Sequence, residues 1–313
     1  MAETKTLITI MGPTASGKTS VAAHLAYLTD GVVLSGDSRQ VYRRMDVGTG
    51  KDLGDYVVNG VQVSYFLIDI CEPGEKYNIY KFKQDFHRVY NELPEAQPKI
   101  FCGGSGLYME AVLGEYYLPD VPEDKALRTE LQDHDLPALV EMLASYGPLH
   151  NTTDTDNKKR VIRAIEIAEY RAKHPIISAD TEHQALTSKI FVIDVDRDVR
   201  RARISSRLDA RLREGLVEEV KGLLDEGISA EDLIYYGLEY KFVTEYVIGE
   251  RTFESMKEAL EIAIHQFAKR QMTWLRGMER RGFSLTYIQP RETPMETSRY
   301  ILDRLIDERI ITI

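Results

Sequence analysis

A glycine-rich run near the start of the chain has the residue spacing of a phosphate-binding loop. It reads MGPTASGKT and places Lys18 and Thr19 directly after the second of two glycines, Gly12 and Gly17. Glycines let backbone N–H groups turn toward an anion, and the N-terminus of a following helix attracts negative charge. The lysine supplies a mobile positive charge for terminal phosphate oxygens, and the threonine supplies a hydroxyl suited to Mg²⁺. The run therefore predicts phosphate binding and leaves open which molecule carries the phosphate.

Asp37 is the second group that could do chemistry. It lies in LSGDSRQVYRR, just past a short apolar run, and open α/β sheets build their sites at the carboxyl ends of strands. A carboxylate beside a phosphate site can hold Mg²⁺ through water or take a proton as a general base. An Asp-Ser pair is more commonly a turn or a helix cap, but its place beside the loop favours the functional interpretation.

The residues after Asp37 add amide, aromatic and cationic side chains of the kind that read nucleic-acid bases and backbones. They are Arg39, Gln40, Tyr42, Arg43 and Arg44. A solvated helix face is the alternative interpretation of this segment.

A further apolar run, KIFC, ends in Gly103-Gly104-Ser105. A nucleotide hydrolase would carry an aspartate at that place to organise Mg²⁺ and water. The glycines suit the close approach of a ligand, and the serine offers a hydroxyl. This ending disfavours a simple ATPase.

The elements that would position these residues alternate between buried strands and helices. Short apolar runs at 6–12, 31–36, 99–104, 189–196 and 284–289 predict strands, and helical patterns separate most of them. The alternation is typical of a parallel sheet with crossover helices, so we predict an α/β fold with a P-loop-containing parallel sheet core. Asn59-Gly60, inside YVVNGVQV, predicts a hairpin turn.

A stretch without strong strands interrupts this pattern. From about Pro119 to His183 the chain reads as helices, DKALRTELQDH, LPALVEMLASY and NKKRVIRAIEIAEYRAKH. We therefore predict three segments. Residues 1–118 form the first part of the P-loop core, 119–184 form an inserted all-helical subdomain, and 185–313 form the second part of the core with a basic C-terminal helix.

The composition is that of an ordinary globular protein, with 43% hydrophobic and 29% charged residues in 313. Cys71 and Cys102 stand far apart, without metal-ligand spacing, and fit a reducing compartment. The first residues show no signal peptide and no apolar run approaches bilayer length, so we expect a cytoplasmic protein without a membrane partner. The net charge of −10 does not exclude a nucleic-acid partner, because phosphate binding depends on local patches.

Basic side chains gather in three predicted helices, and those of the first group recur at helical spacing. The groups are Arg200, Arg203, Arg207 and Arg211; Lys158, Lys159, Arg160 and Arg163; and Lys269, Arg276 and Arg280. On the last long helix a predicted apolar face, marked by Leu260, Ile264, Phe267, Trp274 and Met278, stands apart from the basic one. Such basic faces could follow an RNA backbone, or they could be solvated and paired with local acids.

Five segments, in this order and at these separations, resemble the motifs of the tRNA dimethylallyltransferase family, also called isopentenyl-tRNA or IPP transferases. They are GPTASGKT, GDSRQVYRRMDVGTGK, GGSGLYMEAVL, RVIRAIE and KRQMTWLR, and the resemblance runs from about residue 6 to 278. It implies transfer of a dimethylallyl group from dimethylallyl diphosphate to N6 of the adenine 3′-adjacent to the anticodon of tRNA. The loop, although of the nucleotide- and ATP-binding type, would then hold the donor's diphosphate together with Mg²⁺.

The resemblance also implies the roles of individual residues. Asp37 would take the proton from the attacking amine and share catalysis with Lys18 and Thr19. The residues implied to bind the diphosphate are Gly12, Pro13, Thr14, Ala15, Ser16, Gly17, Lys18 and Thr19, with Thr19 as a transient Mg²⁺ ligand. The residues implied to face the anticodon stem-loop are Asp37, Ser38, Arg39, Gln40, Ser105, Arg128, Lys159, Arg160, Val161, Ile162, Arg163, Lys269, Arg270, Gln271 and Arg276. We expect a monomer.

Two segments depart from the family pattern, so the family's roles are not transferred to them. Ser64-Tyr65-Phe66 stands where the family usually has Pro-His-His, and Glu239 replaces a glycine in a Val-Gly-Tyr-Lys run. Three alternatives stay open: an adenylate isopentenyltransferase acting on free AMP, ADP or ATP, a small-molecule kinase using ATP, and a tRNA-binding protein with a degenerate site. The intact Lys18, Thr19 and Asp37 argue against the third.

Overall fold

The computed structural model of the protein describes residues 6–114, 121–147, 155–174 and 186–311. The chain divides into two compact units. The first, here called the α/β unit, joins Met1–Tyr116 to Ala185–Ile313, and the second, the helical unit, is Tyr117–Gln184.

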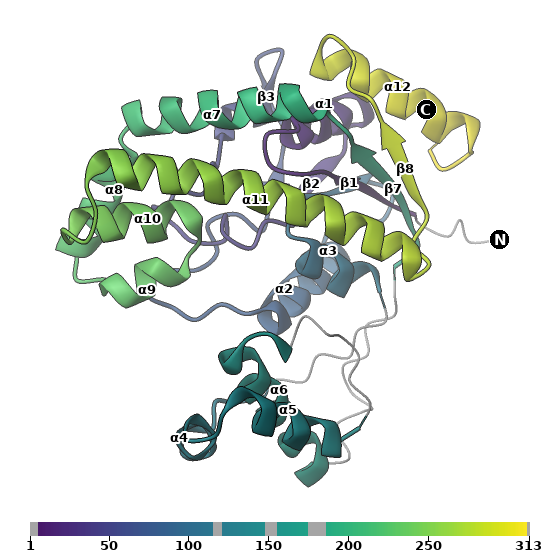
Figure 1. Ribbon diagram of the computed structural model, residues 1–313. Coiled ribbons are helices and arrows are strands. Elements are labelled where there is room, and N and C mark those ends of the chain that lie inside the picture. The colour runs from purple at the N-terminus through teal and green to yellow at the C-terminus, as the bar shows by residue number, and fades with distance from the viewer. Residues whose placement is uncertain (1–5, 115–120, 148–154, 175–185, 312–313) are drawn as a thin grey trace. The chain divides into compact units, whose positions relative to one another are not determined.

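A six-stranded sheet forms the centre of the α/β unit (Figure 1). Its strands are β1 (Leu7–Met11), β2 (Val32–Ser35), β5 (Tyr65–Phe66), β6 (Lys99–Gly103), β7 (Ser188–Ile193) and β8 (Leu285–Ile288), in the order β5-β2-β6-β1-β7-β8. Every pairing is parallel, so the carboxyl ends of the strands meet at one edge. The predicted α/β class and the five strands predicted from apolar runs are confirmed. The short edge strand β5 is an additional one, which those runs do not predict.

The helices of the α/β unit are α1 (Lys18–Thr29), α2 (Ile79–Glu92), α3 (Gly106–Leu113), α7 (Arg197–Arg213), α8 (Leu216–Asp225), α9 (Ala230–Tyr235), α10 (Leu238–Val247), α11 (Phe253–Arg280) and α12 (Pro294–Asp307). A short 3-10 helix, Leu53–Tyr56, precedes an antiparallel ribbon of β3 (Val57–Val58) and β4 (Val61–Gln62). Asn59 and Gly60 join its strands with positive φ angles of 51° and 77°, which confirms the predicted hairpin turn. None of the described helices is long and apolar enough to cross a membrane.

Side chains of the sheet alternate between two hydrophobic cores. On β1, Leu7 and Met11 belong to one core, and Ile8 and Ile10 belong to the other. Helices α1 and α12 supply the second core, whereas α2, α3 and the long α11 supply the first (Figure 1). The two-residue period of a strand sends successive side chains to opposite faces. A sheet that is covered on both faces explains why its strands read as almost continuous apolar runs.

Helix α11 buries most of the stripe that its sequence predicts. Leu260, Ile264 and Met278 are buried in the first core. Phe267, predicted on the same face, is instead 37% exposed, because the buried stripe passes through Ala268. The sequence thus predicts the helix and its apolar side, and misplaces one residue at its border.

The described part of the helical unit consists of α4 (Lys125–Gln132), α5 (Leu136–Ser145) and α6 (Lys158–Lys173). Each helix begins after a polar side chain that accepts a hydrogen bond from a backbone N–H of the first turn: Asp124, Asp135 or Asn157. The helices enclose a small core of their own, made of Leu131, Leu139, Val161, Ile162 and Ile165.

Candidate active site

The floor of the candidate site is main chain, because neighbouring strands end in glycine. A Cβ atom on Gly103, at the end of β6, would lie 2.8 Å from the backbone of Gly36, which follows β2. A Cβ atom on Gly104 would lie 2.9 Å from the carbonyl oxygen of Gly12, which follows β1. No side chain fits at such distances, so only glycine lets these three loops approach one another.

The phosphate-binding loop lies between β1 and α1, as its sequence predicts. Its backbone takes the left-handed conformation at Ala15 (φ 60°) and at Gly17 (φ 83°), which is the N-cap of α1. That N-cap has no side-chain hydrogen bond, so the first N–H groups of α1 are left for another acceptor. A helix N-terminus with free N–H groups, placed at the carboxyl edge of the sheet, is suited to bind an anion.

Lys18 is the first residue of α1, and its surroundings shift the pKa of its ammonium group in both directions. Burial lowers the pKa of its ammonium group, the thiol of Cys102 and the carboxylate of Asp37 act to raise it, and Arg207 and Arg211 lower it. The ammonium group is therefore held where its charge is costly until an anion arrives. A diphosphate would remove that cost.

Two arginines of α7 lie close enough to Lys18 for their charges to act on it. Arg211 is 9% exposed and forms an ion pair of 3.2 Å with Glu239. Arg207 pairs with Asp52 and donates to the carbonyl oxygen of Gly50 at 3.4 Å. The sequence places these arginines on one helix face with Arg200 and Arg203, but only the fold shows that Arg207 and Arg211 are the two that act on Lys18.

The acceptor side of the site joins two strand ends. Asp37 follows β2, and its Oδ1 accepts the backbone N–H of Arg39 at 2.9 Å. Ser38 meets Ser105, which follows β6: its backbone N–H donates to Ser105 Oγ at 3.2 Å, and the two hydroxyls are 3.3 Å apart. Residues that are 67 apart in sequence are thus brought together beside the phosphate-binding loop.

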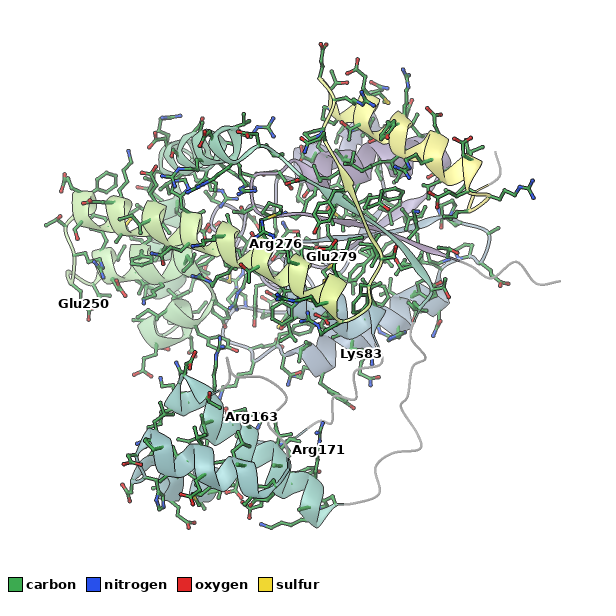
Figure 2. The ribbon with its side chains drawn as sticks, turned by 45° about the vertical axis from the view of Figure 1, so that its right-hand side comes forward. Lys83, Arg163, Arg171, Glu250, Arg276 and Glu279 are labelled. Carbon is green, nitrogen blue, oxygen red and sulfur yellow. The ribbon has the colours of Figure 1, made fainter. Side chains whose placement is uncertain are left out.

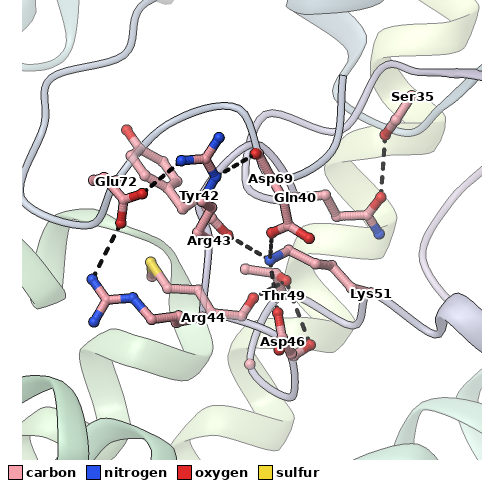
Figure 3. A network of polar contacts seen from close by, with 12 residues as sticks. Ser35, Gln40, Tyr42, Arg43, Arg44, Asp46, Thr49, Lys51, Asp69 and Glu72 are labelled. Carbon is pink, nitrogen blue, oxygen red and sulfur yellow. Dashed lines mark hydrogen bonds and ion pairs between the residues drawn. The ribbon is translucent and has the colours of Figure 1, made fainter. Parts of the chain in front are cut away.

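Gln40 belongs to a network of polar contacts in the segment that follows Asp37 (Figure 3). It is buried, its Oε1 accepts from Ser35 Oγ at 3.1 Å, and its Nε2 donates to the Gly50 carbonyl at 3.2 Å. The fully enclosed Lys51 side chain lies next to it and donates to Asp46, Asp69 and the Tyr42 carbonyl. Gln40, expected from the resemblance to face RNA, here supports the loop that carries Asp37.

Arg39 is half-buried, and its partner is an aromatic ring rather than a carboxylate. Its guanidinium lies 5.5 Å from the ring centroid of Tyr235, which is 65% exposed. Arg43 and Arg44, by contrast, form ion pairs with Glu72, and Arg44 also with Glu226. The sequence does not distinguish these three arginines.

Glu219 of α8 is a residue of this region that sequence reasoning did not single out. Its carboxylate accepts the backbone N–H groups of Asp46, Val47 and Gly48 at 2.7 to 2.9 Å, and the hydroxyl of Tyr240 at 2.6 Å. It thereby fixes the loop that presents Gly50 to Gln40 and Arg207. Its partners are mostly backbone groups, so no residue pattern could have predicted it.

Helix α11 carries the last predicted segment. Lys269, Arg270 and Arg276 are exposed, and Figure 2 shows Arg276 in the C-terminal half of the helix. Gln271 differs, because its amide group is engaged within the protein. Its Oε1 accepts the backbone N–H of Thr14 at 2.8 Å, and its Nε2 donates to the Gly104 carbonyl at 2.9 Å.

The basic residues of the helical unit fall into two kinds. Arg128 and Arg163 both pair with Glu166, which is 2% exposed and also accepts the backbone N–H of Asp124 at 2.6 Å. Burial alone would raise the pKa of Glu166, but the hydrogen bonds from the two arginines outweigh it and lower the pKa. Arg128 also pairs with Glu123 at 2.9 Å. These two arginines therefore hold the unit together.

Lys159 and Arg160, at the start of α6, are exposed. Val161 and Ile162, which follow them in the segment expected to grip RNA, are buried in the core of the unit. Their side chains shape the helix rather than its surface.

Comparison with known proteins identifies the family of the chain. A family model described as IPP transferase matches residues 40–278, and one described as isopentenyl transferase matches residues 5–69. The chain belongs to the IPP transferase family. The family assignment made from the motifs is thereby confirmed.

Relatives within the IPP transferase family cover almost the whole chain. A protein of Porphyromonas gingivalis named tRNA dimethylallyltransferase 2 is 57% identical over 283 residues, which are 90% of this chain and 93% of that protein. A Geotalea daltonii protein named tRNA dimethylallyltransferase 1 is 44% identical over 300 residues, 95% and 94% of the two chains.

Solved structures agree with the fold. A tRNA isopentenylpyrophosphate transferase from Bacillus halodurans superposes with a TM-score of 0.66 at 30% identity, covering 97% of this chain and 98% of that one. A eukaryotic dimethylallyltransferase described as acting on tRNA superposes with a TM-score of 0.76 at 18% identity, covering 97% and 80% of the chains. The second likeness shows that the fold is shared.

Proposed function

We propose that the protein transfers a dimethylallyl group from dimethylallyl diphosphate to N6 of the adenine 3′-adjacent to the anticodon in tRNA, releasing diphosphate. The observation that carries this proposal is the juxtaposition of an anion-binding loop with a carboxylate and a serine pair. Lys18 starts the helix after β1, and Asp37 and Ser105 follow the two neighbouring strands β2 and β6. The names of the relatives support the same reaction.

The donor's diphosphate would lie against the N–H groups of the loop and the start of α1. When the allylic C–O bond breaks, its electron pair leaves with the diphosphate, and negative charge grows there. Lys18, with Arg207 and Arg211 close by, would stabilise that charge more in the transition state than in the ground state. Their positions are fixed before the substrate binds, so little reorganisation is needed.

Asp37 would act on the acceptor. Its Oδ1 is held by the N–H of Arg39, and among the described residues Oδ2 has no hydrogen-bond donor. Oδ2 can therefore take a proton from N6 while the nitrogen forms its bond to the allylic carbon. Ser38 and Ser105, whose hydroxyls meet beside Asp37, are placed to orient the adenine.

The site also fits Mg²⁺ bound together with the diphosphate. Thr19 offers a hydroxyl in the first turn of α1, and Asp37 lies near enough for its charge to act on Lys18. Mg²⁺ usually takes only one or two protein ligands and completes its shell with phosphate oxygens and water. When bound there, the ion would neutralise charge on the leaving diphosphate.

RNA would be held by the exposed cations and not by those already paired. In the helical unit these are Lys159 and Arg160, and on α11 they are Lys269, Arg270 and Arg276. Adenine inside a stacked loop cannot reach Asp37, so the base must be extruded at a cost of roughly a few kcal/mol. We further propose that the protein acts as a monomer in the cytoplasm, which its buried, unpaired Cys71 and Cys102 suit.

One experiment tests the function and its rivals. The protein is incubated with dimethylallyl diphosphate, Mg²⁺ and one acceptor at a time: an anticodon stem-loop with adenine 3′ of the anticodon, the same stem-loop with guanine there, AMP, or ATP. We expect a much larger kcat/KM for the adenine stem-loop than for the other acceptors. Preference for AMP or ATP would indicate an adenylate isopentenyltransferase, and no transfer to any acceptor would refute the proposal.

A further inference from the structure

Helix α11 has two different relations to the site. Its exposed side carries Lys269, Arg270 and Arg276, and its inner side reaches the phosphate-binding loop through Gln271. The sequence gives no reason to separate Gln271 from its basic neighbours, and the resemblance places all four at the RNA. The contacts of its side chain distinguish Gln271 from these neighbours.

The amide of Gln271 bridges the ends of two neighbouring strands. Thr14, in the loop after β1, donates its backbone N–H to Oε1 at 2.8 Å, and the Gly104 carbonyl, after β6, accepts from Nε2 at 2.9 Å. Strands β1 and β6 are paired in the sheet. The bridge therefore ties the phosphate-binding loop to the turn that leads to Ser105.

The Gln271 side chain is closely packed, so it has little room to move. A Cβ atom added at Gly104 would lie 2.7 Å from Nε2 of Gln271 and 3.3 Å from Cε of Lys18. One helical turn further on, the Trp274 ring lies against Gly106 in the same way. Contacts on two successive turns hold α11 in one register against the loop, so Gln271 cannot turn outward without breaking both hydrogen bonds.

We propose that Gln271 is a positioning residue, which holds the Thr14 segment of the phosphate-binding loop in the shape that receives the donor's diphosphate and makes no contact with RNA. The inference rests on the proposed function, since it assigns the anion to that loop. Both of its hydrogen bonds are to backbone groups. Only a side chain with one acceptor and one donor at this length can make the two bonds together.

The test separates affinity for the anion from affinity for RNA. Gln271→Met keeps the length of the side chain and removes both hydrogen bonds. Gln271→Glu keeps the acceptor for Thr14, removes the donor and adds a negative charge beside the loop. For each variant, binding of inorganic diphosphate with Mg²⁺ is measured by calorimetry, binding of the anticodon stem-loop is measured separately, and the KM for dimethylallyl diphosphate is measured by turnover.

We expect Gln271→Met to weaken diphosphate binding and raise the donor KM about tenfold, which corresponds to the loss of about one net hydrogen bond. Gln271→Glu should weaken both further, because its charge repels the anion. Stem-loop affinity should stay at the wild-type value in both variants. The matched control is Gln266→Met, at an exposed glutamine of the same helix, which should change none of the three quantities.

The double variant Lys269→Ala, Arg276→Ala should give the opposite pattern, with weaker stem-loop binding and unaltered diphosphate binding. Weaker stem-loop binding by Gln271→Met with normal diphosphate binding would overturn the proposal, and so would wild-type values throughout. If the wild-type protein transfers no prenyl group, the proposed function fails, but the two binding measurements still decide the role of Gln271. If Gln271→Met does not fold, Gln271→Ala, which removes both hydrogen bonds without adding a charge, decides it by the same two binding measurements.

Discussion

The site end of the α/β unit and the helical unit use arginine in opposite ways. Beside the phosphate-binding loop, Arg207 and Arg211 pair with Asp52 and Glu239, whose side chains are 58% and 21% exposed. In the helical unit, Arg128 and Arg163 share Glu166, which is almost fully buried. A carboxylate that keeps part of its surface in water is a weaker partner, which an anionic substrate can replace more readily than a buried and fully hydrogen-bonded one. The burial of the acid, rather than the number of cations, thus separates a binding site from a structural one.

Loss of the carboxylate of Asp37 should have the largest effect on the catalytic side of this comparison. Asp37→Asn should lower the rate of the chemical step by about 10²–10⁴-fold, the usual worth of a positioned base. The asparagine oxygen can still accept the Arg39 N–H, so the loop and the melting temperature should be preserved. Single-turnover kinetics with both substrates bound measures the rate. An unchanged rate would remove Asp37 from the role of base.

Loss of the carboxylate of Glu166 should have the largest effect on the structural side. Glu166→Ala removes the acceptor that Arg128, Arg163 and the Asp124 N–H share and should destabilise the helical unit by about 3 kcal/mol. The value is at the low end for a broken buried pair, since the arginines are 30% and 35% exposed. Hydrogen exchange in α4 and α6 measures it. Diphosphate binding should not change, and faster exchange at the phosphate-binding loop would contradict the separation of the two regions.

The exposed cations of α6 should matter to RNA and not to folding. Replacing Lys159 and Arg160 together with alanine should weaken stem-loop binding and reduce the slope of log K against log salt by about 1.5, as the loss of two phosphate contacts does. Arg163→Ala should instead lower the stability of the helical unit, because Arg163 is bound to Glu166. Filter binding at several salt concentrations, with hydrogen exchange as the control, distinguishes them. If the double variant and Arg163→Ala reduced the salt slope of stem-loop binding equally, the proposal that only the exposed cations bind RNA would be wrong.

The pH dependence of donor binding should show the smallest effect. Burial lowers the pKa of Lys18 in the free protein, so this lysine loses its charge at a lower pH than the usual 10.5. Donor affinity should be full below the lowered pKa and fall as pH rises through it. Lys18→Arg should move that fall to higher pH even if turnover is slower, because arginine keeps its charge. The KM for dimethylallyl diphosphate between pH 7 and 10 is the measurement, and an identical profile in Lys18→Arg would assign the fall to another group.

The phosphate-binding loop could be read from sequence because its ligands are its own backbone and adjacent side chains. Gly12 to Thr19 are contiguous, so local spacing alone specifies the strand, the turn and the helix start. Asp37 and Ser105 could be proposed for a related reason, since each follows an apolar strand and parallel strands end at one edge. Their meeting through Ser38 confirms the arrangement in space, while their chemical roles stay predictions.

Residues whose partners are distant could not be sorted in this way. Gln40 and Gln271 stand in runs with a nucleic-acid-binding character, yet the amides of both are hydrogen-bonded within the protein. Gln40 binds the Ser35 hydroxyl and the Gly50 carbonyl, and Gln271 binds the backbone of Thr14, 257 positions away. Arg128 and Arg163 look the same as Lys159 until Glu166 is seen to be buried between them.

The sequence by itself determined the family, the parallel α/β class, the strands and the anion-binding loop, because each depends on residues that are near one another or on periodicity along one element. The tertiary structure decided which charges and amides are free. That outcome depends on the burial of a partner and on main-chain groups brought from other strands and helices. Neither the burial of a partner nor the position of a distant main-chain group can be predicted from the residue pattern. Every residue carries the same backbone groups, and any acid can be buried or exposed.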